Sequence, residues 1–402
     1  MKHKVIVIGQ GYTGRLSIIR SVAAMDCEIT LIALLAHSEY EAKIKRKPLD
    51  AYSKYVSRYL FSENYNESML IDLLMNQCVD PNNKVFVFPD NDFSAAAIDN
   101  HRDVLKNHFY CPNIKDRQGA IEEWMDKVKQ KELAKKVGLK VANGVVIEVK
   151  DHHFQIPDSI TYPCFAKPLL SMVGGKSGLK RCDSQTELMG HIEFMLTKRD
   201  DFRILVEEYI HIEREYATLG FSDGEKVIIP GVLELLHVGH ANHFGVALQG
   251  RVFPCKGYEK LIDRFKALVL EMGFVGVFDI DFYESGGEYN FCEMNLRFGG
   301  SGYSFTKMGV NLPVMMMKSL LGESIEDLNQ EVTDSATYFN ERMAVDDWYG
   351  GFMTKEDLFK YREESVIKFV ADEDDPGPQR ILEKEYRKKR IKKMIKGWIG
   401  KK

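Results

Sequence analysis

Short apolar runs alternate with helical stretches over the first 115 residues. The apolar runs are expected to be strands, because they are almost wholly hydrophobic, at residues 4–9, 28–35 and 85–89. Helices are expected between them, over residues 15–25 and around 67–78. Buried apolar strands that alternate with helices are typical of a parallel sheet covered on both faces. The pattern therefore predicts a parallel α/β layer over residues 1–115.

The pattern changes at Ile121. One helix is expected from there to Gly138, a residue type that commonly ends helices. Several strands then follow with little helix between them, at residues 145–149, 162–168, 203–210, 215–221 and 226–236. A second long helix is expected over 259–272. This order favours an α+β region with an antiparallel core.

The sequence next predicts an acidic hairpin that turns at residues 285–287. Alternate residues of a strand share a face, so Asp279 and Asp281 point the same way. The return strand carries a second polar set on one face, namely Glu293, Asn295 and Arg297. Clustered carboxylates repel one another unless a positive group lies among them, and such oxygens suit Mg²⁺. The alternative is a solvated hairpin face.

A glycine turn follows the first predicted strand and opens a helix, with Gly9, Gly11 and Gly14 in the spacing of a dinucleotide fingerprint. The acid that would bind ribose hydroxyls at the end of the second strand is missing. The turn is therefore interpreted as weak evidence for a dinucleotide. A structural tight turn and a contact to phosphate or substrate are the alternatives.

Lys167 lies in a strand whose neighbours are nearly all apolar, where a lysine must be paired or hold an anion. A loop rich in glycine and serine follows directly and could close its backbone N–H groups over phosphates, with Ser171, Gly174, Gly175, Ser177 and Gly178. A surface hairpin turn is the alternative. Glu207 and Glu208 end the next strand and could receive a nucleoside or be solvated.

In this order, the pieces resemble the ATP-grasp superfamily of carboxylate–amine ligases, over roughly residues 1–322. In that family a lysine follows Asp about eleven residues before a Gly, and here Lys127 and Gly138 match it. The resemblance implies that ATP is bound by the following residues: Lys127, Lys167, Ser171, Gly174, Gly175, Ser177, Gly178, Glu207, Glu208, Tyr209, Ile210 and Glu215. It implies Mg²⁺, or else Mn²⁺, at Asp281, Glu293 and Asn295. Lys167 and Arg297 would be catalytic, with Arg297 steadying the carboxylate or acyl phosphate.

The resemblance also implies a domain order. A Rossmann-like layer that no longer binds NAD is expected over 1–115. An ATP-grasp domain follows over 116–325, with a lid at about 140–210. An extension and linker over 326–380 and a tail over 381–402 complete the order. Gly11, His243 and Arg297 are candidate substrate contacts. His237, His240 and His243 could alternatively bind zinc or be structural, although their spacing fits no standard finger.

The implied reaction is amide formation through an acyl phosphate. No side-chain nucleophile is needed for it, because phosphoryl transfer depends on positioning and charge neutralisation. Looser likeness to D-aspartate ligase favours a cell-wall or surface-glycan precursor, or an amino acid, as substrate. Carboxylation, carbamoyl phosphate formation and a scaffold without turnover remain alternatives. Many members of the family are dimers, so a homodimer is a further expectation.

Composition adds two expectations. The 402-residue chain is 45% hydrophobic and 28% charged, as in ordinary soluble proteins, and its seven cysteines form no CxxC pair. No secretory leader or spanning segment is evident, so a cytoplasmic protein with reduced thiols is favoured.

Charge is concentrated at the end of the chain. Residues 387–402 hold nine Lys or Arg and no acid, and removing those nine charges from the net −4 leaves −13 elsewhere. An apolar stripe in this segment predicts a basic amphipathic helix, with Ile391, Met394, Ile395, Trp398 and Ile399. Its expected partner is the inner face of an anionic membrane, with the acidic body of the protein or a sister subunit as the alternative, and nucleic acid less favoured.

Overall fold

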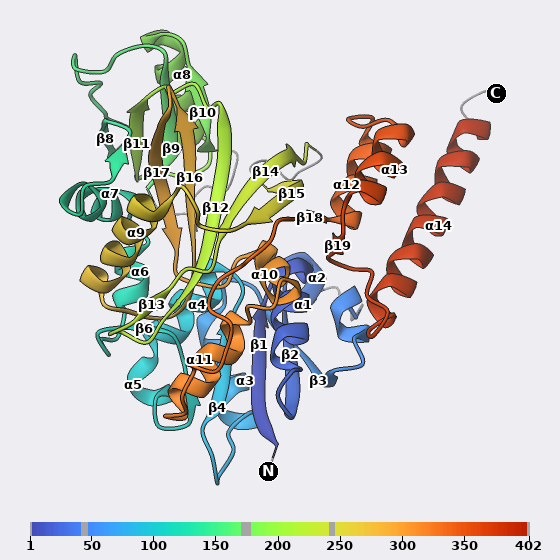
Figure 1. Cartoon of the computed structure of the whole chain (residues 1–402). Coiled ribbons are helices and arrows are strands. Elements are labelled where there is room, and N and C mark those ends of the chain that lie inside the picture. Colours follow the sequence, from blue (N-terminus) through green and yellow to red (C-terminus); the bar gives the residue numbers. More distant parts are fainter. Residues whose placement is uncertain (1, 42–46, 170–177, 241–245, 400–402) are drawn as a thin grey trace.

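The N-terminal part of the chain is built on a parallel sheet. The computed structural model describes all residues except 1, 42–46, 170–177, 241–245 and 400–402 (Figure 1). The strand order is β3-β2-β1-β4-β5, and every pair is parallel. The strands are β1 (His3–Gly9), β2 (Cys27–Leu35), β3 (Val56–Glu63), β4 (Val85–Pro89) and β5 (Phe109–Tyr110).

Both faces of this sheet are buried. Val5 and Val7 of β1 pack in one core with Ile18 of α1, whereas Ile6 and Ile8 pack in another with α3 and α4. The helices and turns of this part are α1 (Tyr12–Val22), α2 (His37–Glu41), η1 (Leu49–Tyr52), α3 (Glu67–Gln77), α4 (Asp92–Asn100) and α5 (Arg102–Leu105). The predicted parallel layer is thus confirmed.

A small antiparallel sheet and a larger sheet follow, and the larger one is antiparallel except for two parallel strand pairs. The smaller has the order β10-β9-β11-β8, with β8 (Gly144–Val149), β9 (Cys164–Pro168), β10 (Lys180–Cys182) and β11 (Phe202–Glu208). The larger centres on β12 (Arg214–Ser222), β16 (Phe274–Ser285) and β17 (Glu288–Asn295). Its further strands are β6 (Asn113–Ile114), β7 (Lys140–Val141), β13 (Val227–Ile228), β14 (Val232–Val238), β15 (Ala247–Phe253), β18 (Ala336–Phe339) and β19 (Ile367–Lys368).

The helices of this region place the larger sheet against the N-terminal layer. Helix α9 packs its apolar face on the sheet, and α11 shares a core with α1 and β12. The helices are α6 (Ala120–Trp124), α7 (Lys127–Lys136), α8 (Gln185–Leu196), α9 (Glu259–Met272), η3 (Gly300–Gly302), α10 (Tyr303–Lys307) and α11 (Leu312–Leu320). The C-terminal part adds α12 (Glu341–Gly350), α13 (Lys355–Glu364) and α14 (Gly377–Ile399), the last of which projects from the molecule in Figure 1.

Several predicted elements have other bounds. The first helix begins at Tyr12, not Arg15, because Gly11 is extended and opens it directly. The single helix expected from Ile121 is two helices, because the Asp126 carboxylate accepts hydrogen bonds from the backbone of Val128 and Lys129 and starts α7. The strand expected over 226–236 is broken between β13 and β14, where Pro230 has no N–H to donate.

The predicted hairpin and the helix over 259–272 are confirmed with the expected residues. Strand β3 was not expected, since it lies at the edge of its sheet and is only partly buried. Among the described helices, none is long and apolar enough to cross a bilayer.

Candidate active site

Strands β16 and β17 bring the hairpin acids together. Asp281 lies opposite Glu293, and Asp279 lies opposite Asn295, in the antiparallel register. The Asn295 amide donates to Asp281 Oδ2 at 3.0 Å. Asp279 Oδ1 is buried without a hydrogen-bond partner in the described structure. The predicted acidic face is therefore a half-buried cluster and not a solvated surface.

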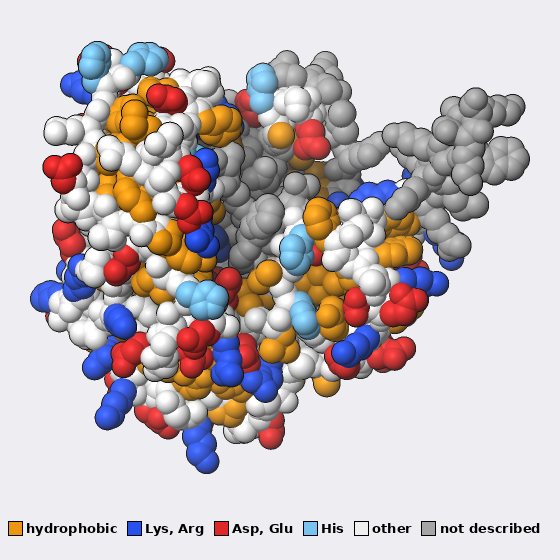
Figure 2. Space-filling view, turned by 90° about the horizontal axis from the view of Figure 1, so that it is seen from above, with side chains coloured by type: hydrophobic (Ala, Val, Ile, Leu, Met, Phe, Trp, Pro, Cys, Tyr) orange, Lys and Arg blue, Asp and Glu red, His pale blue; other side chains and the backbone are white. Residues whose placement is uncertain are grey.

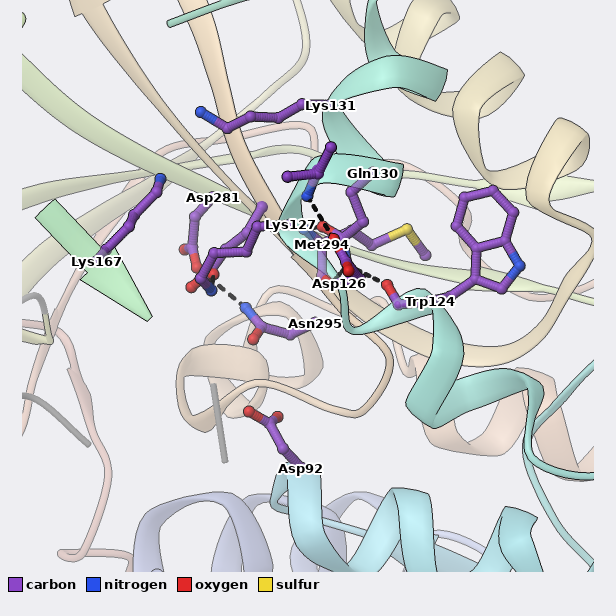
Figure 3. Close-up of polar contacts among 12 residues, drawn as sticks. Asp92, Trp124, Asp126, Lys127, Gln130, Lys131, Lys167, Asp281, Met294 and Asn295 are labelled. Atoms are coloured by element: carbon purple, nitrogen blue, oxygen red, sulfur yellow. Dashed lines mark hydrogen bonds and ion pairs between the residues drawn. The ribbon is translucent and has the colours of Figure 1, made fainter. Parts of the chain in front are cut away.

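Arg297 links this cluster to the N-terminal layer. Its Nε donates to Asp92 Oδ1 at 2.9 Å, and its Nη2 donates to Asn295 Oδ1 at 3.3 Å. Asp92 is the first residue of α4, below Asn295 in Figure 3. Two parts of the chain that are 205 positions apart thus meet at one guanidinium.

Helix α7 delivers Lys127 to the same cluster, where it forms an ion pair with Glu293. The start of α7 is held on β17 by Gln130, whose side chain exchanges two hydrogen bonds of 2.8 Å with the backbone of Met294 (Figure 3). The lysine is therefore positioned by the backbone of the strand that carries Glu293 and Asn295.

A second ion-paired group lies at Glu207, which is buried at the end of β11. Lys167 of β9 places its Nζ 2.8 Å from Glu207 Oε2, and Lys131 of α7 also forms an ion pair with Glu207. Lys131 was missed by sequence reasoning. Its position one helical turn after Lys127 could have shown that both side chains lie on one helix face.

The environment shifts the pKa values of these groups. Burial raises the pKa of Asp279 to about 6 against the opposing Arg297, and burial with its acidic neighbours raises that of Asp281 well above the ordinary value. Burial also disfavours the charged form of Glu293, but Lys127 holds its pKa below normal. Burial and Lys167 lower the pKa of Lys131. The carboxyl groups of Asp279 and Asp281 therefore hold a proton more readily than free ones do.

The donor set fits a hard divalent cation. Asp281, Glu293 and Asn295 offer side-chain oxygens on paired strands. Within the described residues, there is no group of three or more His, Cys, Asp or Glu side chains that could hold a metal ion. Mg²⁺ does not require a full set of protein ligands, because it usually keeps waters and phosphate oxygens as ligands.

The residues between 208 and 215 that the resemblance assigned to ATP binding differ in their surroundings. Glu208 accepts hydrogen bonds from the backbone and side chain of Asn143, at 2.8 Å and 3.0 Å. Tyr209 stacks under the Arg181 guanidinium at 4.3 Å. Ile210 follows in the loop before β12 and is half-buried, as is Glu215 in that strand. Burial raises the pKa of Glu215.

Gly178 is buried, and its carbonyl accepts a hydrogen bond from His191 at 3.1 Å. A side chain there would collide with Pro168 at 2.5 Å, so the position requires glycine. The other expected loop residues lie outside the described residues, namely Ser171, Gly174, Gly175 and Ser177.

The predicted histidine set is not a cluster in the described part of the chain. His237 stacks on Tyr361 with ring centres 4.1 Å apart. His240 lies 3.4 Å from the carboxylate of Asp347. His243 lies outside the described residues. His237 and His240 each contact a side chain of a later helix, which favours a structural role for both over zinc binding.

The glycine turn accommodates a carboxylate. A Cβ at Gly9 would lie 1.3 Å from Asp90 Oδ1, and one at Gly14 would lie 3.2 Å from Asp90 Oδ2. Gly11 is the residue before α1, and a Cβ there would be 3.8 Å from the same carboxylate. The close packing of Asp90 explains the glycines at positions 9 and 14, which favours the structural interpretation of the turn.

The chain is similar in sequence to a known domain family. Residues 132–312 match the sequence profile of the ATP-grasp domain. This chain carries an ATP-grasp domain. The carbamoyl phosphate synthase large chain of Clostridium botulinum (strain Loch Maree / Type A3) is 26% identical over 228 residues, which are 55% of this chain and 21% of that protein. The chain thus spans about a fifth of the length of the curated relatives it matches.

Solved structures show the same fold. N5-carboxyaminoimidazole synthetase from Staphylococcus aureus, complexed with ADP, aligns with a TM-score of 0.62 at 16% identity and covers 90% of this chain and 88% of its own. The biotin carboxylase domain of Hydrogenobacter thermophilus 2-oxoglutarate carboxylase, with MgADP and bicarbonate, aligns with a TM-score of 0.63 at 17% identity over 84% and 74%. The chain therefore has an ATP-grasp fold with an N-terminal parallel-sheet domain.

The matched ATP-grasp domain does not hold the whole candidate site. Lys127 and Lys131 precede residue 132, and Asp92 belongs to the N-terminal layer. Both ion-paired groups and the Arg297 contact thus need residues outside the matched range.

Proposed function

We propose that this chain is an ATP-dependent carboxylate–amine ligase that forms an amide bond and releases ADP. The observation that carries the proposal is the convergence of Lys127 and Lys167, from a helix and a distant strand, beside the oxygen cluster of Asp281, Glu293 and Asn295. Two buried ammonium groups beside oxygen ligands suit a triphosphate with a divalent cation.

The residues have distinct parts in this chemistry. A substrate carboxylate oxygen attacks the γ-phosphorus of ATP, the bond to the β-phosphate oxygen breaks, and ADP leaves with the electron pair. Lys127 and Lys167 neutralise the phosphate oxygens, while Arg297 orients the carboxylate and the acyl phosphate. The substrate amine then attacks the acyl carbon, phosphate leaves, and the amine nitrogen loses a proton. Asp281, Glu293 and Asn295 would hold Mg²⁺, which supplies further charge neutralisation at the phosphates.

The first test is ADP release with substitutions at the two ion-paired groups. Lys167→Ala and Glu293→Ala should each lower turnover about 100-fold or more, because each removes charge from the phosphate or cation site. Lys135→Ala is the matched control, since this lysine is exposed at the end of α7 and should leave turnover unchanged. Unchanged turnover in either site variant would contradict the assignment.

A carboxylase-type reaction is the second candidate, favoured by the structural likeness to carboxylases. The biotin carboxylase domain of 2-oxoglutarate carboxylase was solved with MgADP and bicarbonate. Bicarbonate alone would then stimulate ADP release, whereas the ligase requires both a carboxylate and an amine.

We also propose that residues 387–402 attach the enzyme to an anionic membrane, consistent with a lipid-linked or surface-polymer substrate. The start of this segment is docked on the protein, since Lys389 lies 2.8 Å from Asp346 and Tyr386 contacts the Glu341 carbonyl at 3.4 Å. Ile391 is 57% exposed. On the face that Figure 2 shows, charged side chains of both signs are interspersed among the described residues, whereas residues 387–402 hold nine Lys or Arg and no acid.

Vesicle flotation tests the attachment. The full chain should float with vesicles that contain phosphatidylserine or phosphatidylglycerol, and added salt should weaken this binding by screening the charges. Neutral phosphatidylcholine vesicles and a chain ending at residue 386 should both bind much less. Equal binding with and without the tail would remove the proposal.

A further inference from the structure

The guanidinium of Arg297 is held along one edge by protein groups. Its Nε donates to Asp92 Oδ1 at 2.9 Å, and its Nη2 donates to Asn295 Oδ1 at 3.3 Å. A guanidinium has five N–H groups in a fixed plane. The other three donate to no residue that the structure describes, and the side chain is 21% exposed. These remaining N–H groups can therefore bind a ligand.

Asp92 sits on a firmly anchored part of the N-terminal layer. It is the first residue of α4 and follows Asn91, whose side chain accepts from the Ser94 backbone at 3.3 Å and so caps the helix. Residues 93–99 of the same helix are all buried. An acid in the first turn is also stabilised by the helix dipole. The Asp92 carboxylate is thus a fixed point against which the guanidinium of Arg297 is oriented.

A second acid competes with Asp92 for Arg297. Burial opposes the charged form of Arg297, but nearby acids raise its pKa above the ordinary value, first Asp92 and then Asp279. Neither described hydrogen bond of Arg297 goes to Asp279, however, and the buried Oδ1 of Asp279 has no partner in the described structure. Without the Asp92 carboxylate, Coulomb attraction would draw the guanidinium toward Asp279.

The orientation of Arg297 continues along a chain of hydrogen bonds. Asn295 accepts from Arg297 through Oδ1 and donates through its amide nitrogen to Asp281 Oδ2 at 3.0 Å. Because one end of an amide accepts and the other donates, these two bonds fix which way the Asn295 side chain faces. In Figure 3, Asn295 lies between Asp281 and Asp92. The N-terminal layer is thus connected to the oxygen cluster through Asp92 and Arg297.

We infer that Asp92 is a positioning residue of the proposed ligase, through which the N-terminal layer takes part in binding the carboxylate substrate. The inference rests on the proposed function, in which Arg297 orients that carboxylate. Asp92 holds the Nε edge of the guanidinium, so the free N–H groups of Nη1 and Nη2 are presented side by side. A carboxylate accepts two parallel hydrogen bonds from such an edge.

The test is ADP release by the full chain with MgATP. L- and D-amino acids are offered singly and in pairs, and bicarbonate is offered separately. The carboxylate that stimulates release most strongly becomes the probe, and bicarbonate is the probe if it alone is active. KM for the probe and KM for ATP are then measured for the native chain and for each variant.

Asp92→Ala should raise KM for the probe about tenfold and leave KM for ATP unchanged, because it removes a charge-assisted contact that orients Arg297. Asp92→Asn should raise KM for the probe about threefold, since the amide oxygen still accepts the Nε–H but carries no charge. Asp116→Asn is the matched control and should change neither constant. Asp116 receives the same kind of bond, from Arg102 Nε at 2.7 Å, but its side chain is 66% exposed and has no described hydrogen bond or ion pair with the cluster.

A double substitution separates positioning from a structural role. Arg297→Lys keeps a positive charge but has no planar pair of donors, so Asp92 has no guanidinium left to orient. Adding Asp92→Ala to Arg297→Lys should therefore change KM for the probe by less than about twofold. If Asp92 only stabilised α4, the two fold-changes would multiply. ATP binding shows that each variant is folded, and Asp92→Asn replaces Asp92→Ala in both measurements if the latter does not bind ATP.

The outcomes separate this inference from the proposed ligase. A rise in KM for the probe that disappears in the Arg297→Lys background, with KM for ATP unchanged, supports the inference. An unchanged KM for the probe, equal rises for the probe and ATP, or fold-changes that multiply overturn it and leave the ligase proposal standing. If bicarbonate alone is active, the ligase proposal fails, while the role of Asp92 is decided by the same constants. No stimulation by any compound overturns both.

Discussion

The ATP-grasp site and the end of the N-terminal sheet balance their buried polar groups in different ways. In the first, Glu293 is paired with Lys127 and Glu207 with two lysines, and only Asp279 keeps a buried oxygen without a described partner. In the second, Asp90 and Asn64 each bury an oxygen that has no described hydrogen-bond partner. The acids of the first region neutralise ammonium groups that would otherwise be buried without a counter-charge. The unpaired oxygens have no such compensation, so burying them costs stability.

The largest expected effect on stability is at Glu207, the carboxylate that pairs with two lysines. Glu207→Ala leaves two buried ammonium groups without their carboxylate and should lower the free energy of unfolding by about 3–5 kcal/mol. ATP with Mg²⁺ should restore part of this stability, because phosphates replace the lost acid. Chemical denaturation with and without nucleotide measures both effects.

Glu208→Ala is the control for that experiment. Glu208 is adjacent in sequence but exposed, and it contacts only Asn143 among the partners described above. It should cost about 1 kcal/mol or less. If the two substitutions destabilise the protein equally, the ion pairs of Glu207 do not hold this part of the fold together.

A smaller change in the free energy of unfolding, of opposite sign, is expected from a substitution at Asp90. Burial raises the pKa of Asp90 to about 7, although Arg15 and Arg297 oppose the rise. Because the folded pKa is above the ordinary value near 4, ionisation of Asp90 reduces stability as pH rises from about 4 to about 7, and not beyond. Asp90→Asn should therefore be more stable than the native chain at pH 8, by about 2 kcal/mol after allowing for partial exposure of the carboxyl group.

Unfolding free energies at pH 5 and pH 8 measure this difference. Asp103→Asn is the control, since Asp103 is exposed beside Lys106 and should show no comparable gain at high pH. A gain for Asp90→Asn that is the same at both pH values would show that the carboxylate is not strained by burial. The contrast between the paired and unpaired regions would then disappear.

Local pattern was enough for several parts of the fold and the site. The hairpin itself follows from alternation along two strands and a glycine turn between them. The register that sets Asp281 opposite Glu293 also needs a bulge next to Asp281, which alternation does not predict. Helix α9 was predictable to the residue, because its apolar positions repeat at helical spacing up to Gly273 in the left-handed conformation. The resemblance that named Lys127 and Lys167 likewise rests on residue order and spacing.

Other features depend on contacts between distant segments, and no local pattern contains them. The burial of Glu207 between Lys131 and Lys167 is one. The close packing of Asp90 against Gly9 is another, and so is the hydrogen bond that Arg297 donates to Asp92.

The sequence by itself determined the type of fold, the acidic hairpin and the lysines, because hydrogen-bond periodicity and side-chain alternation act over a few residues. Only the tertiary structure decided which charges neutralise one another and which oxygens stay unpaired. Pairing and desolvation depend on distances across the folded chain, which no local stretch of sequence specifies.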